Sequence, residues 1–186
     1  MRFSPLLRRF ALCTLAGVLW TVAAPSFAHI VLAEPVALAN TSYRATLRVG
    51  HGCSGAATSA IRVTVPTGFR GAKPMPKVGW ILFIKSAKLD KPYDDHGKPV
   101  TEDVGEISWT AASRDSWLPD AHFDEFVMQG SAAQAGPTWF KVLQTCDQTS
   151  NNWAEIPVTG IATNKLKNPA VLLEIIPSEQ AGGHQH

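Results

Sequence analysis

The sequence predicts an all-β protein, built as an antiparallel β-sandwich. Two observations carry this prediction: short segments alternate apolar and polar residues, and turn-forming residues separate nearly all of them. The 186-residue chain contains 13 prolines and 14 glycines to supply such turns, and no ten-residue stretch has a convincing helical pattern. About eight or nine short strands joined by turns are typical of a sandwich.

The individual strands are expected from short runs of residues. The clearest is 43–49, where Tyr, Ala, Leu and Val occupy one face and Arg, Thr and Arg the other. Other expected strands cover residues 30–32, 60–65, 80–89, 106–111, 122–128, 139–145 and 170–176. Residues 73–79 should be extended, because Pro74 and Pro76 each bias the preceding residue away from helix. We expect a polar turn over 93–99 and a loop over 114–120.

The first 28 residues have the pattern of a secretory signal peptide. Three arginines precede an apolar run over residues 11–24, and the small residues Ser26 and Ala28 stand at the −3 and −1 positions of a cleavage site. Cleavage after Ala28 would make His29 the first residue of the mature protein. The predicted organisation is therefore a signal peptide (1–28), one sandwich domain (29–177) and a flexible, histidine-containing tail (178–186).

The composition of the mature chain limits its function. Removing Arg2, Arg8 and Arg9 from the 17 Lys and Arg residues leaves 14 against 15 Asp and Glu, a net charge of −1. This balance argues against a nucleic-acid partner. No apolar run of about 18 residues follows the signal peptide, so no membrane anchor is expected. The predicted location is the periplasm.

Two cysteines remain after cleavage, Cys53 and Cys146. An even pair in an oxidising compartment favours a disulfide, which would stabilise the fold by about 4 kcal/mol in the chain-entropy model. The alternative is a pair of thiolates that bind a soft metal. Neither cysteine is followed closely by His and then Met, and this argues against a blue-copper electron-transfer centre.

His29 is the first candidate metal ligand, because an N-terminal histidine can chelate a metal with its α-amine and its imidazole Nδ1. These groups titrate near pH ~8 and ~6.5, so a metal can displace both protons near neutral pH. Two nitrogens in one plane suit Cu(II) better than the tetrahedral sites of zinc. The alternative is that His29 merely begins an edge strand.

His51 and Trp153 are expected to lie near His29. His51 follows the second expected strand and stands between two glycines, where backbone can approach a ligand closely. A Cys53–Cys146 disulfide would bring its loop to the segment that runs into Trp153. If the first two strands are neighbours, the sandwich gathers all three residues at one end. Taken singly, His51 could be an exposed loop histidine and Trp153 a packing residue.

Other polar clusters have simpler explanations. A turn accounts for the acids and histidine at 94–96, exposed strand positions account for residues 122–125, and His184 and His186 belong to a tail that could bind Cu(II) or Ni(II) loosely. The sequence contains no phosphate loop, no Gly-x-Ser-x-Gly, no His-Glu-x-x-His and no dinucleotide fingerprint.

A series of short motifs also resembles a known family in order and content. The motifs are His29-Ile30, Tyr43-Arg44, Leu47-Arg48-Val49, His51-Gly52-Cys53, Lys73-Pro74-Met75-Pro76-Lys77, Gly79-Trp80, Tyr93-Asp94, His96-Gly97-Lys98-Pro99-Val100, Phe123-Asp124-Glu125-Phe126, Gln144-Thr145-Cys146 and Trp153-Ala154-Glu155-Ile156-Pro157. In them the sequence is similar to the YcnI-like family of exported bacterial copper-binding proteins, in its Gram-negative variety. The resemblance covers roughly residues 28–157.

The resemblance implies a cupredoxin-like or immunoglobulin-like sandwich that binds Cu(II) through a single N-terminal histidine brace. In the better-known form of the family a Glu completes the site and a Trp lies close by. His29 and Trp153 match by position, but the region that should supply the Glu, residues 50–53, contains no acid. His51 is the expected replacement, and Glu34 is a further candidate.

We therefore expect a periplasmic copper chaperone or carrier in copper uptake or homeostasis, not an enzyme. Its expected partners are the copper ion and an inner-membrane copper transporter or another periplasmic copper protein. Met75 is a candidate for assisting with Cu(I). One alternative is a copper oxidase or polysaccharide monooxygenase with a two-histidine brace of His29 and His51. Another is an interaction sandwich without metal.

Overall fold

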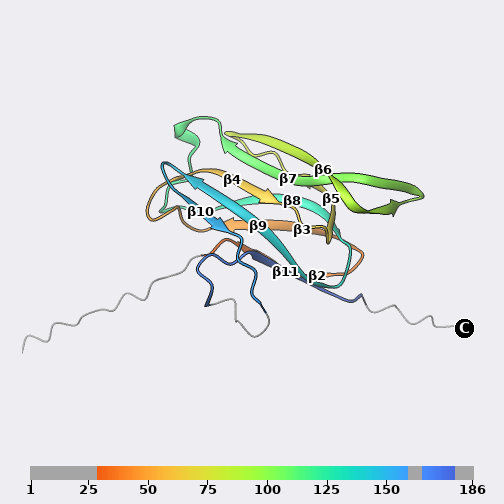
Figure 1. Cartoon of the computed structure of the whole chain (residues 1–186). Coiled ribbons are helices and arrows are strands. Elements are labelled where there is room, and N and C mark those ends of the chain that lie inside the picture. The colour runs from red at the N-terminus through yellow and green to blue at the C-terminus, as the bar shows by residue number, and fades with distance from the viewer. Residues whose placement is uncertain (1–28, 159–164, 179–186) are drawn as a thin grey trace, which may run out of the picture.

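The computed structural model describes residues 29–158 and 165–178, which form two stacked β-sheets (Figure 1). The four-stranded sheet has the order β1-β3-β8-β5. The second sheet has the order β2-β11-β9-β4-β7-β6, with β10 also paired to β9. The strands are β1 (Val31–Leu32), β2 (Val36–Leu38), β3 (Thr41–Val49), β4 (Thr58–Thr64), β5 (Phe69–Pro74), β6 (Trp80–Asp95), β7 (Lys98–Ala111), β8 (Asp124–Ala132), β9 (Gly136–Cys146), β10 (Ser150–Trp153) and β11 (Val171–Ile176).

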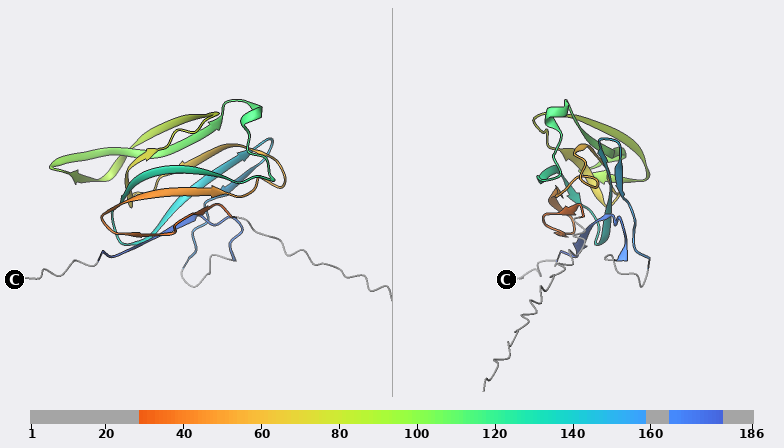
Figure 2. Two further views of the ribbon diagram at one scale, coloured as in Figure 1. Left: turned by 180° about the vertical axis from the view of Figure 1, so that it is seen from behind. Right: turned by 90° about the vertical axis from the view of Figure 1, so that its left-hand side faces the viewer.

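The predicted antiparallel sandwich is confirmed, with one exception in pairing. Among the described residues, every strand pair is antiparallel except β2 with β11, which run parallel at the edge of the larger sheet. Seen from behind, β3 and β8 form one layer in front of β4 and β9 (Figure 2). The predicted signal peptide (1–28) and residues 179–186 of the predicted tail lie outside the described residues, so the predicted domain boundaries stay a prediction.

Alternation places the core between the two layers. In β3 the side chains of Tyr43, Ala45, Leu47 and Val49 are buried, as their spacing predicts. The largest fully buried side chain among the described residues is Trp109, which packs edge-on against Phe126 from the facing sheet, at 5.7 Å between ring centroids. Its indole N–H donates to the backbone carbonyl of Met75 at 3.0 Å, so the one polar atom of this large ring is satisfied.

The hairpin formed by β6 and β7 is longer than the sequence suggests. The expected polar turn over 93–99 is wrong in extent: only His96 and Gly97 separate the strands, with φ values of 54° and 80°. Two consecutive left-handed residues make the tight hairpin turn whose twist matches that of its strands. The hairpin projects beyond the sandwich (Figure 1). The strands expected over 80–89 and 106–111 are present, but the polar, exposed residues between them carry no clean alternation, and this hid the outer part of both strands.

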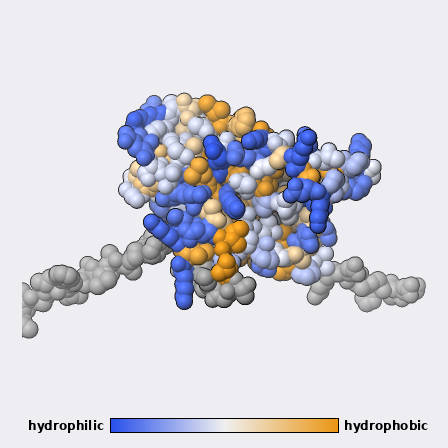
Figure 3. All heavy atoms as spheres, viewed as in Figure 1, coloured by the Kyte–Doolittle hydropathy of each residue, from blue (hydrophilic) through white to orange (hydrophobic). Residues whose placement is uncertain are grey.

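The first part of β6 leaves apolar side chains on the surface. Ile81, Phe83 and Ile84 are all exposed, and β6 is the outermost strand of its sheet. Figure 3 shows apolar surface gathered over this start of β6, along the upper edge of the view. In the described part of the chain, no helix is long and apolar enough to cross a membrane.

The strand β9 organises the end of the molecule that concerns function. One edge of β9 pairs first with β11, over Gly136–Phe140, and then with β10, over residues 142–145. The opposite edge pairs with β4. Since β9 ends at Cys146 and β3 ends at Val49, the loops that follow these strands are available to meet at one end of the sandwich.

Candidate metal centre

The loop that carries His51 is folded tightly upon itself. Cys53 and Ala56 exchange backbone hydrogen bonds of 3.0 and 3.1 Å around Ser54 and Gly55, whose φ values are 52° and 88°. Gly52 lies so close to this turn that a Cβ on it would stand 1.8 Å from the Ala56 carbonyl oxygen. The loop therefore requires glycine at position 52, next to His51.

Two long-range contacts fix the loop to the rest of the molecule. The predicted disulfide is confirmed: Cys53 and Cys146 are bonded, both buried, with 5.9 Å between their Cα atoms. The Gly52 N–H donates to the Asp120 carboxylate at 2.9 Å. The disulfide reaches the end of β9, and Asp120 belongs to the segment that precedes β8, so the loop is held from both sheets.

Gln144 connects His51 to Trp153. Its side chain is fully buried, and its Nε2 donates to the backbone carbonyl of His51 at 2.7 Å and to the Thr58 hydroxyl at 2.8 Å. Its Oε1 accepts a hydrogen bond from the Trp153 indole at 3.1 Å. A buried amide with both ends bonded orients each of its partners. One side chain thus sets both the His51 loop and the indole ring.

His29, His51 and Trp153 lie together, as the sequence predicts. The imidazole of His29 meets the Trp153 indole edge-on at 5.6 Å between ring centroids, and the imidazole of His51 does so at 6.2 Å. The β1–β3 register, with Val31 opposite Arg48, continues to place His29 opposite Gly50. The pairing of β1 with β3 therefore brings the backbone of His29 to the start of the His51 loop.

The two histidine rings present different nitrogens. The Nε2 atom of His29 is buried, so Nδ1, which lies on the backbone side of the ring, is the nitrogen suited to share a metal with the α-amine. The Nδ1 atom of His51 contacts the Gly52 carbonyl oxygen. A proton on that Nδ1 leaves the lone pair of the ring on Nε2. The two rings thus suit metal binding through Nδ1 of His29 and Nε2 of His51.

Glu34 is not brought to this group. It is exposed, and its backbone carbonyl accepts a hydrogen bond from the Tyr43 hydroxyl, near the other end of β3. Four residues lie between Glu34 and His29, a span of up to about 16 Å when the chain is extended. Its charge acts elsewhere: burial and the nearby Glu34 carboxylate raise the pKa of Tyr43 to about 12.

The weaker candidates occupy separate places. Asp94 accepts the Gly97 N–H at 2.8 Å and Asp95 pairs with His96, both at the tip of the β6–β7 hairpin, as expected of a turn. Asp124 forms an ion pair with Lys77 at 2.7 Å, and Glu125 forms one with Arg48 at 2.9 Å. His122 is exposed close to them in the chain. Met75 is half exposed directly after β5. Among the residues that the structure describes, no three His, Cys, Asp or Glu side chains form a metal-binding group. The tail residues His184 and His186 lie outside that part.

Sequence reasoning missed Gln144 and Asp120. Gln144 did carry a signal: it continues the inward series of Phe140 and Val142 in β9, so its polar side chain had to be buried and therefore bonded. Asp120 carried none, because its contact with Gly52 joins residues 68 positions apart.

Comparison with known proteins agrees with this architecture. A family model described as a domain of unknown function (DUF1775) matches residues 29–175. The chain belongs to this family, which includes the YcnI-like proteins. The match begins at His29, the predicted first residue of the mature protein.

A solved structure shares the fold. It is the crystal structure of an uncharacterized protein from Nocardia farcinica, described as revealing an immunoglobulin-like fold. The two chains are 22% identical with a TM-score of 0.61, and the similarity covers 79% of this chain and 97% of the other. The protein therefore has an immunoglobulin-like β-sandwich fold. No curated protein matches the chain significantly.

Proposed function

We propose that the mature protein begins at His29 and binds Cu(II) in the periplasm, as a copper chaperone or carrier. The observation that carries the proposal is the meeting of His29 and His51 at the ring of Trp153, 5.6 and 6.2 Å from it. Membership of the family that includes the YcnI-like proteins supports it, as does a family match that starts at His29.

The ligands in this proposal are three nitrogens. The α-amine and Nδ1 of His29 form the chelate, and His51 is the third ligand, in the position where the better-known family form has a Glu. The buried Nε2 of His29 supports this choice of Nδ1, and the contact of His51 Nδ1 with the Gly52 carbonyl supports Nε2 as the other donor. Nitrogen ligands of this kind suit Cu(II).

Such a site suits exchange of the metal between proteins. His29 would lie at the chain terminus, and neither histidine is fully buried, so a partner protein can supply competing ligands. Trp153 is buried behind both rings and supports them from the protein side. The proposed activity is thus binding and ligand exchange with an inner-membrane copper transporter or another periplasmic copper protein, without turnover.

The first experiment is a Cu(II) titration of protein that starts at His29, followed by electron paramagnetic resonance. It uses a His184→Ala/His186→Ala background to remove the tail. We expect one equivalent of Cu(II) with a nitrogen-rich signal and quenching of tryptophan fluorescence. One alanine added before His29 should change that signal, because the α-amine then belongs to the added residue and no longer forms the same chelate ring with Nδ1 of His29.

Matched variants assign the third ligand. His51→Ala should weaken Cu(II) binding and change the signal, whereas His96→Ala, at the exposed hairpin tip, should do neither. An unchanged resonance signal after the alanine extension would overturn the proposed site, and absence of stoichiometric binding would favour the metal-free interaction sandwich. Multiple turnovers of a reductant with peroxide would favour the oxidase or monooxygenase. Mass spectrometry of the exported protein checks that it begins at His29 in the periplasmic fraction.

A further inference from the structure

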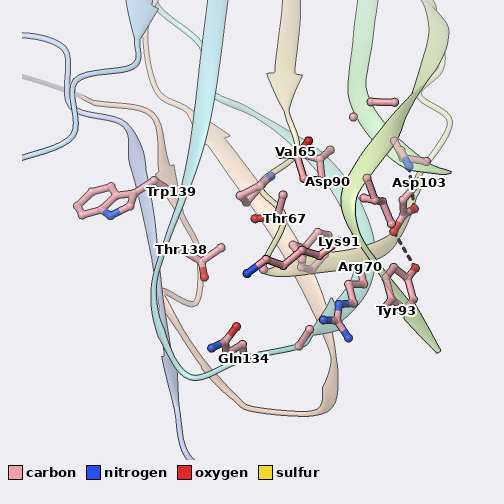
Figure 4. Close-up of a pocket in the computed structure, with 18 of the residues that line it drawn as sticks. Val65, Thr67, Arg70, Asp90, Lys91, Tyr93, Asp103, Gln134, Thr138 and Trp139 are labelled. Carbon is pink, nitrogen blue, oxygen red and sulfur yellow. Dashed lines mark hydrogen bonds between the residues drawn. The ribbon is translucent and has the colours of Figure 1, made fainter. Parts of the chain in front are cut away.

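A cavity of about 770 Å³ lies at the end of the sandwich opposite His29. Its walls come from the β6–β7 hairpin, the turn between β4 and β5, and the turn between β8 and β9 (Figure 4). His29 and His51 adjoin the start of β4 and the end of β9, whereas this cavity adjoins the end of β4 and the start of β9. Its volume is within the usual range for small-molecule sites, about 300–1,000 Å³.

One wall of the cavity is fixed by Asp103. Its carboxylate accepts hydrogen bonds from the Tyr93 hydroxyl at 2.8 Å, the Gly71 N–H at 2.9 Å and the Val104 N–H at 2.7 Å. These bonds join β5, β6 and β7 across one carboxylate. Burial together with the Asp103 bond raises the pKa of Tyr93 to about 12. The Asp103 carboxylate is therefore engaged by hydrogen bonds within the wall of the cavity.

Two cations face the opening. The guanidinium of Arg70 stacks on the Tyr93 ring, 4.4 Å from its centroid, which limits its movement. Figure 4 shows Lys91 extending across the opening toward Thr138, with Arg70 on the side nearer Gln134. Within the described residues, neither Arg70 nor Lys91 forms an ion pair.

The other charged residues of the lining do not fully cancel the positive charges of Arg70 and Lys91. Lys88 adds a third cation to the lining, whose acids are Asp90 and Asp103, so the cations outnumber the acids by three to two. An arginine fork and a lysine ammonium are suited to a carboxylate or phosphate, because both groups offer several acceptor oxygens. Fixed positive charge facing an open cavity favours an anionic ligand.

The deeper lining is apolar. Val65 and Phe69 are buried core residues that also border the cavity, and Leu89 lines it from β6. We propose that this cavity binds a small amphipathic organic anion, whose carboxylate or phosphate contacts Arg70 and Lys91 and whose apolar body lies against Val65 and Leu89. The site is independent of the copper proposal, since it shares no residue with it.

The test is a titration of metal-free protein followed by two-dimensional NMR. The probes share a hexyl group as their apolar body: heptanoate, hexyl phosphate, 1-hexanol and hexylamine. We expect at least one of the two anions to shift the amides of Thr67, Arg70 and Gln134 saturably, and the tighter anion identifies the head group. The alcohol and the amine should bind about tenfold more weakly or not at all, because they lose the charged hydrogen bonds.

Three variants make the test specific to this cavity. Arg70→Gln should weaken binding of the preferred anion about tenfold. The double variant Arg70→Gln/Lys91→Gln should weaken that binding further. Arg44→Gln, which removes an exposed charge on β3 outside the cavity, should leave binding unchanged. Equal binding of hexanol and the anions, equal binding by the Arg70→Gln and Arg44→Gln variants, or shifts confined to other surfaces would each overturn the proposal.

Discussion

The indole N–H of Trp153 donates a 3.1 Å hydrogen bond to the side-chain oxygen of Gln144, which is fully buried. The other end of the same amide holds the His51 carbonyl at 2.7 Å. The ring against which both histidines pack and the loop that carries one of them are therefore positioned by one side chain. Stability and the geometry of the candidate site should change together when Gln144 changes.

Replacing Gln144 by leucine should lower the free energy of unfolding by about 2–4 kcal/mol, because buried partners on His51, Thr58 and Trp153 lose their hydrogen bonds. Urea unfolding measures this. The matched control is Gln129→Leu: Gln129 is exposed and donates one bond, to Ser42, so its loss should cost about 0.5 kcal/mol or less. Equal effects of the two variants would refute the role of Gln144.

The same residue predicts an effect on metal binding that rests on the proposed function. Gln144→Leu should weaken Cu(II) binding by about 10–100-fold, as loss of a group that orients metal ligands does. If Cu(II) affinity stays constant while stability falls, Gln144 supports the fold alone.

Alanine at Gly52 should damage the His51 loop, whereas alanine at Gly50 should not. A Cβ at Gly52 would stand 1.8 Å from the Ala56 carbonyl oxygen, which is backbone and cannot move alone, while nothing lies within 4 Å of a Cβ at Gly50. Thermal unfolding and the NMR signals of His51 compare the two. We expect a clear loss of stability and displaced His51 signals only for Gly52→Ala. The opposite order would contradict the loop geometry.

Opening the Cys53–Cys146 disulfide should destabilise the protein strongly. The two residues are 93 positions apart, and closing a loop of that length is worth about 4–5 kcal/mol in the chain-entropy model. Cys53→Ala/Cys146→Ala should lower the urea midpoint, and a reductant should do the same to the unmodified protein. The reductant should leave the double variant unchanged. An unaltered midpoint in the reduced protein would show that the bond adds nothing.

The two tyrosines should titrate above their usual pKa of 10.0. Burial and neighbouring carboxylates raise the pKa of both Tyr43 and Tyr93 to about 12. Absorbance at alkaline pH should follow their ionisation. Asp103→Asn should lower the pKa of Tyr93, because the hydrogen bond to a carboxylate and its charge are lost, whereas Asp90→Asn should leave it in place. Two transitions near 10 in the unmodified protein would contradict the burial of these rings.

The same shifts predict how stability depends on pH. The unfolded chain releases its tyrosine protons near pH 10, and the folded chain does so near 12. The stabilisation from these groups is therefore complete below pH 10 and is lost as the pH rises from 10 to 12. Urea unfolding at pH 9, 10 and 11 should show a decline that is smaller in the Asp103→Asn variant.

The elements with strong local signals were predictable. The alternation in β3 and the apolar run of β11 depend on residues close in sequence, and the structure has both strands. Conversely, β6 and β7 extend through exposed polar residues, where pairing with each other, not burial, keeps the chain extended. Periodicity reports burial and therefore gives no account of such a hairpin.

The sequence by itself determined the all-β class, the cysteine pair and the histidine that a signal-peptide cleavage would expose, because each depends on residue type and local spacing. Only the tertiary structure decided which distant residues meet. It placed His29 and His51 at Trp153, linked Gln144 to both the loop and the indole, and left Glu34 elsewhere on the surface. The register of β1 on β3 and of β10 on β9 sets these contacts. Register arises from packing of the whole sheet, which no single segment specifies.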